Sequence, residues 1–484
     1  MDALVRRLVE LTSSFSLAEV PDRARRAAVR HIVDSVACAI AGYGTEPGRR
    51  ARRFAGALRH EPGATVIGAG TKSAPAYAAF ANTVMVRALD WNDGMLARGG
   101  GHPSDMLGAL FATGEVAGSS GAQVLEATVL AYELLGALGR VAPLTERGWD
   151  QGLFVGAAAA LAMGKLLGLR ERELANALSL SLVPAVPLLV TRRGEISMWK
   201  NAATAWALLN ATNAVAFAEA GMTGPSHPFE GPCGVFDQVT GRIEPQLPAD
   251  PEGALVIELS HQKLFPAESH AQALLGLLPR LRAFTSVEEI EAIEIEAYAV
   301  LRNAIGSHPS VYDPKTPETA DHSLPYLLAV GLVDGAVTPA SFTPERLADP
   351  ALRPLMARIS IREDPDLTAG YRPARSEISG APRARITVRK RSGEVLEAEA
   401  SFPKGHARNP FDDDDVNAKL DVACAGRLTE SQRETVRGAW WRIEEAPTLA
   451  PLMATIADLG ASEEPGARGR ATSRAARPAS PSTS

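Results

Sequence analysis

Two carboxylates, three consecutive glycines and a histidine lie close together in the first quarter of the chain. Asp90 and Asp93 end one apolar run, Gly99–Gly101 follow, and His102 opens the next run. Amides at a helix start can face an anion, and glycines let the backbone pass close to a ligand. The segment therefore fits a proton-transfer site for an anionic substrate. It fits equally well a pair of Asp caps on a flexible loop.

Two lysines in apolar surroundings add to this segment. Lys200 stands at the head of an otherwise apolar helical run, and Lys263 precedes Glu268 and His270 at another expected helix start. Such a lysine is usually a surface residue whose stem covers apolar neighbours, whereas a buried one would await a carboxylate. Lys263 also lies where we expect two structural units to join, and clefts at such junctions are favoured ligand sites.

Other short patterns do not indicate a nucleotide-binding or metal site. Gly68–Ser73 lacks the Gly and Lys of a phosphate-binding loop and the third Gly of a dinucleotide fingerprint, so we interpret it as a turn before a helix. The acidic run Asp412–Asp415 fits a solvated helix start, where the helix dipole favours carboxylates. His31 and His60 are isolated in the sequence, and we expect them to be structural or surface residues. We therefore predict no metal site.

The composition argues against a nucleic-acid binder. The chain has 50 Lys and Arg against 56 Asp and Glu, a formal charge of -6, and a nucleic-acid binder normally shows a basic patch or stripe. Cys38, Cys233 and Cys424 are far apart, which fits neither a disulfide framework nor an iron–sulfur ligand run. We expect free thiols in a reducing cytosol. Without an apolar leader or a membrane-spanning run, we predict a cytoplasmic protein with no membrane partner.

The elements that must position these residues are mostly helices. Apolar residues recur at helical spacing through the first 225 residues, for example in Ala76–Ala88 and Gln123–Val141. The pattern changes near Pro266. Ile290–Tyr298 alternates apolar and polar residues as a strand does, and Arg383–Phe402, with Ser-Gly at its centre, is typical of a β-hairpin.

These runs predict two domains and a tail. We expect a mainly α fold, in which residues 1–265 form a large all-helical domain that residues 410–461 complete. Residues 266–409 are expected to form a smaller α+β lid domain of a common size. Residues 462–484 are mostly Ala, Arg, Pro, Ser and Gly without periodicity, which predicts a disordered tail.

Six short motifs occur in a fixed order along nearly the whole chain. They are Leu89–Asp93, Gly101–Asp105, Ser197–Lys200, Phe265–Gln272, Asp321–Tyr326 and Gly405–Pro410. In this order they resemble the MmgE/PrpD family, which includes 2-methylcitrate dehydratases and cis-aconitate decarboxylases. The resemblance implies a large helical domain, a smaller α+β lid, a homodimer and catalysis without a cofactor.

The resemblance also implies roles for particular residues. Lys200 and His270 would bind carboxylates and stabilise charge, while His102 and Asp90 would handle the proton, with Asp90 as orienter or base. The helix dipole should favour the neutral imidazole of His102. Against these roles, Asp90 could be only a helix cap. We further predict substrate-binding roles for Asp93, Arg98, Lys263, Gln272 and His322, although Lys263 could be a surface charge and His322 could brace the lid hinge or a dimer contact.

The implied activity is the dehydration of a citrate-like tricarboxylate in propionate metabolism, without a metal or an iron–sulfur cluster. The loop length between Asp90 and His102 resembles the 2-methylcitrate dehydratase branch most. Gly94 and Gln151 depart from the family pattern, which often has Thr and His there, and we expect both at the pocket wall. A decarboxylase or epimerase of the same family is the alternative enzyme. A catalytically silent helical scaffold is the alternative from another class.

Overall fold

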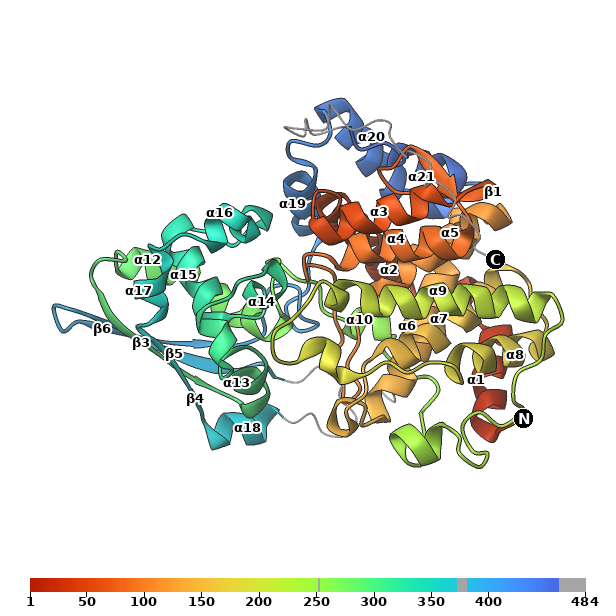
Figure 1. Ribbon diagram of the computed structural model, residues 1–484, viewed down its shortest axis with the longest axis horizontal. Helices are drawn as coiled ribbons and strands as arrows, with labels where there is room; N and C mark the ends of the chain where they lie inside the picture. Colours follow the sequence, from red (N-terminus) through yellow and green to blue (C-terminus); the bar gives the residue numbers. More distant parts are fainter. Residues whose placement is uncertain (251–252, 372–380, 461–484) are drawn as a thin grey trace, which may run out of the picture.

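The computed structural model describes residues 1–250, 253–371 and 381–460 and shows a mainly helical molecule with two hydrophobic cores (Figure 1). The expected fold class, a large helical domain with a smaller mixed domain, is confirmed. In the described ranges, no helix combines the length and apolar character needed to cross a membrane. The predicted tail, residues 462–484, lies outside the described residues.

The larger core is built from helices at both ends of the chain. Its buried residues run from Leu4 to Ile257 and again from Phe411 to Leu459, and Figure 1 shows the C-terminal helices beside helices from the first part of the chain. Its helices are α1 (Ala3–Ser14), α2 (Asp22–Gly42), α3 (Glu46–Ala57), α4 (Pro75–Arg87), α5 (Leu107–Ala117), α6 (Gly121–Val141), α7 (Gly152–Leu166), α8 (Glu171–Leu182), α9 (Trp199–Glu219), α10 (Val256–Leu259), α19 (Asp413–Cys424), α20 (Glu430–Trp441) and α21 (Ala450–Thr455).

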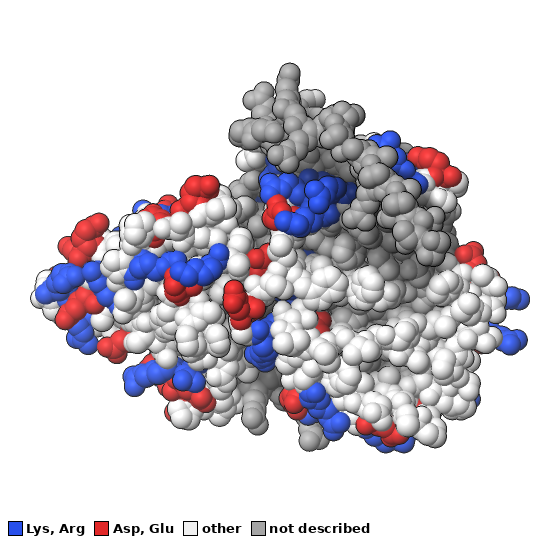
Figure 2. All heavy atoms as spheres, viewed as in Figure 1, with Lys and Arg blue, Asp and Glu red and all other residues white. Residues whose placement is uncertain are grey.

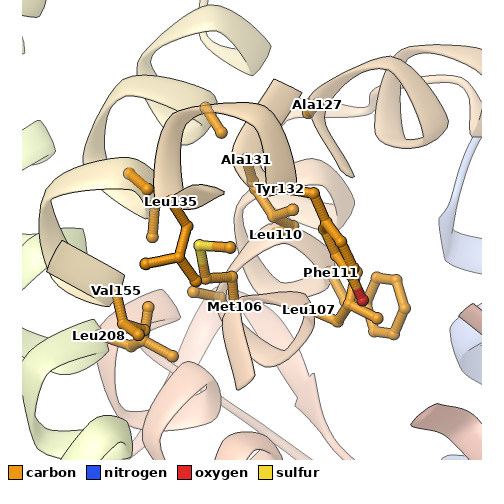
Figure 3. Close-up of a cluster of buried hydrophobic side chains, with 14 of the residues drawn as sticks. Met106, Leu107, Leu110, Phe111, Ala127, Ala131, Tyr132, Leu135, Val155 and Leu208 are labelled. Carbon is orange, nitrogen blue, oxygen red and sulfur yellow. The ribbon is translucent and has the colours of Figure 1, made fainter. Parts of the chain in front are cut away.

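Small residues and local caps explain how these helices form and approach one another. Ser120 and Gln123 make a capping box at the start of α6, which satisfies amides that have no partner within the helix. α4 packs against α5 where a Cβ at Gly108 would lie 2.4 Å from Thr83 Oγ1. Figure 3 shows the apolar side chains that fill the space between α5, α6, α7 and α9, with Tyr132 among them.

The first part of the chain is less uniformly helical than its periodicity predicts. β1 (Arg59–Val66) and β2 (Thr71–Ser73) form an antiparallel pair. Gly68 and Gly70 have φ of 71° and 59° in the turn between them, a conformation that glycine adopts without strain. The turn before α4 is confirmed, but the prediction of an almost wholly helical segment is wrong here. The β1 strand was missed because its outer half is exposed and lacks alternation.

The smaller core surrounds a four-stranded sheet in the order β4-β3-β5-β6. β3 (Ile290–Ala297) pairs in parallel with β4 (Ile359–Glu363) and antiparallel with β5 (Ala384–Lys390), which pairs antiparallel with β6 (Val395–Ala400). The predicted strand and hairpin are confirmed. The helices are α11 (Gln272–Leu275), α12 (Leu278–Phe284), α13 (Ala299–Ile305), α14 (Pro317–Ala320), α15 (Leu324–Asp334), α16 (Pro344–Leu347), α17 (Leu352–Met356) and α18 (Pro365–Tyr371).

The path of the chain between the two cores suggests where the domains end. The smaller core takes its buried residues from Ala267 to Ala400, between the two parts of the larger core. We therefore propose domain limits near residues 265 and 410. Both limits lie close to the segments that carry the candidate site residues, so small shifts between the two units would change the geometry of the site.

Candidate active site

Asp90 lies just beyond the end of α4 in an unusual backbone conformation. Its amide donates to the Arg87 carbonyl (3.1 Å), and its φ is +49°, a region that Asp tolerates better than most residues. The residue is 1% exposed. The helix end thus carries a carboxylate into the interior, where a charge needs partners.

Three cations surround the Asp90 carboxylate. Arg87 Nη1 lies 2.8 Å from Oδ1, Lys200 Nζ lies 3.0 Å from Oδ2 and Lys263 Nζ lies 2.5 Å from Oδ1. Burial raises the pKa of the Asp90 carboxyl, but the charges of Arg87, Lys200 and Lys263 outweigh it and hold that pKa well below its usual value. Asp90 is therefore an ionised anchor. The interpretation of Lys263 as a surface charge was wrong, since it is 0% exposed.

The smaller core adds Asp321 and His322 to this cluster, from the segment between α14 and α15. Lys200 Nζ lies 2.6 Å from Asp321 Oδ2, and His322 Nδ1 lies 2.5 Å from Asp321 Oδ1 and 3.7 Å from Asp90 Oδ2. Ligand atoms of Asp90, Asp321 and His322 lie within 4.8 Å of one another. Both carboxylates already hold lysine ammonium groups, whose charge would oppose a divalent cation there.

His102 presents a neutral imidazole to the same cluster. Its Nδ1 lies 2.6 Å from the Asp93 carbonyl oxygen, so we assign the proton to Nδ1, and Nε2 accepts from Arg87 Nη2 at 3.1 Å. Burial lowers the pKa of His102 well below its usual value, and Arg87 and Lys263 lower it further. Desolvation and nearby cations, rather than the expected helix dipole, are thus the main causes that favour the neutral form.

The Asp93 carboxylate binds groups outside the Asp90 cluster and stabilises the loop that carries His102. One of its oxygens accepts from the Ser104 amide (3.0 Å) and hydroxyl, while the other accepts from Tyr132 Oη (2.6 Å) and lies 2.7 Å from His31 Nδ1. Because its oxygens have these four partners, Asp93 is placed to hold structure rather than substrate. His31, expected to be a structural or surface residue, is buried in α2 and has the structural role, since it contacts Asp93.

Two further predicted site residues lie apart from the Asp90 cluster. Arg98 is exposed and makes two 2.8 Å hydrogen bonds to Glu146. Gln272 is buried, but its amide group binds the backbone of Phe265 and Ala267. The structure therefore does not bring Arg98 or Gln272 to the cluster.

His270 occupies an intermediate position. It is buried, with Nδ1 2.6 Å from Tyr298 Oη. Burial lowers its pKa, Glu268 opposes this, and the charges of Lys263 and His322 lower it further. His270 is therefore within electrostatic range of Lys263 and His322, although its hydrogen-bond partner is the tyrosine.

Sequence reasoning missed Arg87, Asp321 and the pair of Arg192 and Asp150. Arg87 is 1% exposed in the last turn of an apolar helix, and its apolar neighbours were the available signal. Arg192 Nε donates to Asp150 Oδ2 at 2.5 Å, and the Arg192 charge contributes to the lowered pKa of His102. Within the described part of the chain, Arg87 Nε and Arg192 Nη1 are buried donors without a hydrogen-bond partner. Unused donors of this kind are suited to carboxylate oxygens.

The two departures from the family pattern have different surroundings. Gly94 exchanges backbone hydrogen bonds with His261, both 2.9 Å, and a Cβ at Gly94 would lie 2.7 Å from His261 Cε1. The imidazole of His261 therefore fills the space that a threonine side chain would need. Gln151 is 8% exposed, and its Nε2 is buried without a partner among the described residues.

Comparisons with known proteins indicate the same family in both the first and the second part of the chain. The MmgE/PrpD N-terminal domain matches residues 6–248, and the MmgE/PrpD C-terminal domain matches residues 265–443. The chain is 32% identical over 374 residues to a 2-methylcitrate dehydratase of Salmonella typhi, covering 72% of this chain and 75% of that one. It is 30% identical over 370 residues to one of Escherichia coli (strain K12), with 72% and 75% covered. A mitochondrial 2-methylcitrate dehydratase of Yarrowia lipolytica is 28% identical over 404 residues, with 78% and 75% covered.

Proposed function

The chain belongs to the MmgE/PrpD family, and we propose that it is a hydro-lyase that dehydrates a citrate-like tricarboxylate. The reaction we assign is of the type that converts 2-methylcitrate to 2-methyl-cis-aconitate. The observation that carries this proposal is the convergence of Arg87, Lys200 and Lys263 on Asp90, next to a neutral His102. The names of the relatives supply the substrate class.

The charge of the cluster supports an anionic substrate. Buried cations are stable only with compensating charge or hydrogen bonds. Lys200 divides its ammonium group between Asp90 and Asp321, while Arg87 Nε and Arg192 Nη1 have no acceptor among the described residues. We assign these donors to substrate carboxylates. A tricarboxylate can supply more than one such group at once.

The lowered pKa of His102 supports its assignment as the base. In the proposed reaction, His102 Nε2 takes the proton on the carbon next to a carboxylate, because this nitrogen is the unprotonated one. It now accepts from Arg87 Nη2, so a carboxylate that binds Arg87 would free it. Lys200 and Lys263 stabilise the negative charge that builds on the substrate carboxylate next to the carbon that loses its proton. His322 donates a proton to the departing hydroxyl, which leaves as water, and the carbon–carbon double bond forms.

Product analysis tests this proposal directly. The purified protein is incubated with 2-methylcitrate, citrate and cis-aconitate, and the products are followed by absorbance of the enoic acid and by release of carbon dioxide. We expect enoic acid from a hydroxy tricarboxylate and its loss in Lys200→Met. Carbon dioxide release would instead identify a decarboxylase, and binding without turnover of any tricarboxylate would favour a scaffold.

We also propose that the protein acts as a homodimer through the outer face of α9. Trp199, Trp206 and Phe217 on this helix are 48%, 50% and 48% exposed, and Val186 and Val190 nearby in the chain are 70% and 72% exposed. Figure 2 shows the surface over α9 largely free of charged side chains. In a two-fold dimer a surface meets its own copy, so an uncharged face avoids repulsion between like charges.

Light scattering tests the dimer surface. We expect the wild-type protein to be dimeric and Trp206→Glu to shift it toward monomer, because two buried carboxylates would face each other across the contact. Val300→Glu is the matched control, since Val300 is 47% exposed in α13 of the smaller core. A Trp206→Glu protein that stays as dimeric as the control would contradict the location.

A further inference from the structure

Lys419 is a buried cation far along the sequence from the candidate site. It lies in α19, and its side chain is 1% exposed. Its Nζ lies 2.8 Å from Asp34 Oδ1 in α2, and it donates to the carbonyl oxygens of Trp91 (2.7 Å) and Lys263 (3.1 Å). The ammonium group of Lys419 thus donates to two backbone carbonyl groups and is compensated by one carboxylate.

The two carbonyl groups belong to the segments that hold the Asp90 ion pair. Trp91 directly follows Asp90, and Lys263 is the residue whose ammonium group binds the Asp90 carboxylate. Lys263 Nζ also donates to the Asp90 carbonyl at 2.8 Å. The indole ring of Trp91 lies 5.0 Å from Lys419 Nζ, within the range of a cation–π contact. Lys419 thus ties together two backbone segments that are far apart in sequence.

We propose that Lys419 is a positioning residue of the candidate active site, with Asp34 as its counter-ion. Lys419 acts through the backbone of Trp91 and Lys263, because its buried ammonium group donates to the carbonyl oxygens of these two residues. It sets the spacing between Asp90 and Lys263, on which carboxylate binding depends. The effect on catalysis rests on the proposed hydro-lyase function, whereas the effect on geometry does not.

Lys419 brings α19, from the last part of the chain, into contact with the segments of Trp91 and Lys263. α19 follows the smaller core in sequence but packs on α2 of the larger core. The Asp34–Lys419 pair therefore joins α2 and α19, which come from the N-terminal and C-terminal parts of the larger core, next to Trp91 and Lys263. Deletion or displacement of α19 would remove one of the contacts that hold the segments of Asp90 and Lys263 together, without removing any group that is assigned to substrate.

Two variants separate a positioning role from a merely structural one. Lys419→Met removes the donors but keeps most of the side-chain volume, and we expect kcat to fall about 10- to 100-fold because misplaced catalytic groups lose rate steeply. Its melting temperature should also fall, since Asp34 is left buried and unpaired. The double variant Asp34→Leu, Lys419→Met removes both charges, so stability should recover while kcat stays low. Recovery of kcat together with stability would overturn the proposal.

A readout without substrate keeps this test independent of the reaction. The Trp91 indole donates to the Leu264 carbonyl oxygen at 3.0 Å, so its N–H resonance reports the contact between the two segments. We expect this resonance to move in Lys419→Met and in the double variant, but not in the control Lys404→Met, whose lysine pairs with Asp415 at the surface. Inactive wild-type protein would reject the hydro-lyase function alone. An unmoved Trp91 resonance would reject the positioning role.

Discussion

At the scale of single residues, the site depends on one carboxylate held between cations from three segments. Arg87, Lys200 and Lys263 each lie within 3.0 Å of an Asp90 oxygen. Such a buried arrangement is costly to break, because removing one partner leaves the others uncompensated. Burial, together with Arg87 and Lys263, lowers the pKa of His102 and favours its neutral form, so binding and proton transfer share two of these cations.

His102→Asn tests the assigned base. We expect kcat to fall by about 10²- to 10⁴-fold, the usual contribution of a general base, because the amide nitrogen or oxygen cannot replace the basic Nε2. KM should change less, since Arg87 and the lysines remain. Steady-state kinetics on the accepted tricarboxylate measures both values. Near-normal turnover on every tested tricarboxylate would exclude His102 as the base.

Asp90→Asn tests the ionic anchor without changing the backbone requirement. Asn tolerates the positive φ of this position, but its amide removes the negative charge that faces Lys200 and Lys263. We expect the free energy of unfolding to fall by about 3–5 kcal/mol, the range for breaking a buried ion pair, together with loss of activity. Urea unfolding measures the change. An unchanged unfolding midpoint would show that Asp90 does not stabilise the fold by compensating the charges of the neighbouring cations.

At the scale of elements, the contact between α4 and α5 positions the groups of the site. Arg87 is the last residue of α4, and His102 directly precedes the short turn that leads into α5. Gly100 and Gly101, with φ of 63° and 152°, let the loop between α4 and α5 turn back. The close approach at Gly108 therefore sets the distance between Arg87 and His102.

Gly108→Ala tests this contact. The added methyl group would lie 2.4 Å from Thr83 Oγ1 and 2.7 Å from the Thr83 amide nitrogen, so the helices must separate. Overpacking of this kind costs about 1–3 kcal/mol of stability, and we expect lower kcat as well. The control is Gly438→Ala in α20, where the nearest atom would be a guanidinium nitrogen at 3.8 Å. Equal unfolding midpoints for the two variants would argue against a tight α4–α5 contact.

At the scale of the whole molecule, the candidate site lies where the two cores meet. Lys200 from the larger core pairs with Asp321 from the smaller one, and His261 pairs its backbone with Gly94 just before the smaller core begins. Burial lowers the pKa of each of three histidines near this contact, His102, His261 and His270. The stability of the assembled molecule should therefore respond to pH.

His261→Asn tests this response. Burial holds the pKa of His261 well below its usual value, and Lys263 lowers it further. As the pH falls below about 6.5, the unfolded chain binds a proton that the folded protein does not. The contribution of His261 is therefore present above that pH and is lost as the pH falls toward the folded pKa. It changes by at most about 1.4 kcal/mol per pH unit.

The comparison between variant and wild type isolates this one histidine. His102 and His270 respond in the same direction, whereas burial raises the pKa of Asp105 to about 6 and that of Glu133 to about 7, which acts in the opposite direction. We expect the difference in unfolding free energy between wild type and His261→Asn to shift in favour of the variant from pH 7 to pH 5. A constant difference over this range would contradict the assignment.

The sequence by itself determined the elements and many of the chemical groups. Helical periodicity predicted α4 and α6, and alternation predicted β3 and the β5–β6 hairpin, because these patterns depend on neighbours within one element. The helix expected to start near His270 is divided into α11 and α12, where Pro279 lacks the N–H that would continue the first helix. Asp90, His102 and Lys200 were found because their types stand out within short motifs.

Only the tertiary structure decided which of these groups meet. Arg87 contacts His102, Lys200 contacts Asp321, and Lys419 reaches Trp91 and Lys263. Arg98 and Gln272 were chosen by the same local reasoning and lie with other partners. The physical reason is that an ion pair between distant segments depends on how helices pack and what they bury. Residue spacing within a motif carries no information about that.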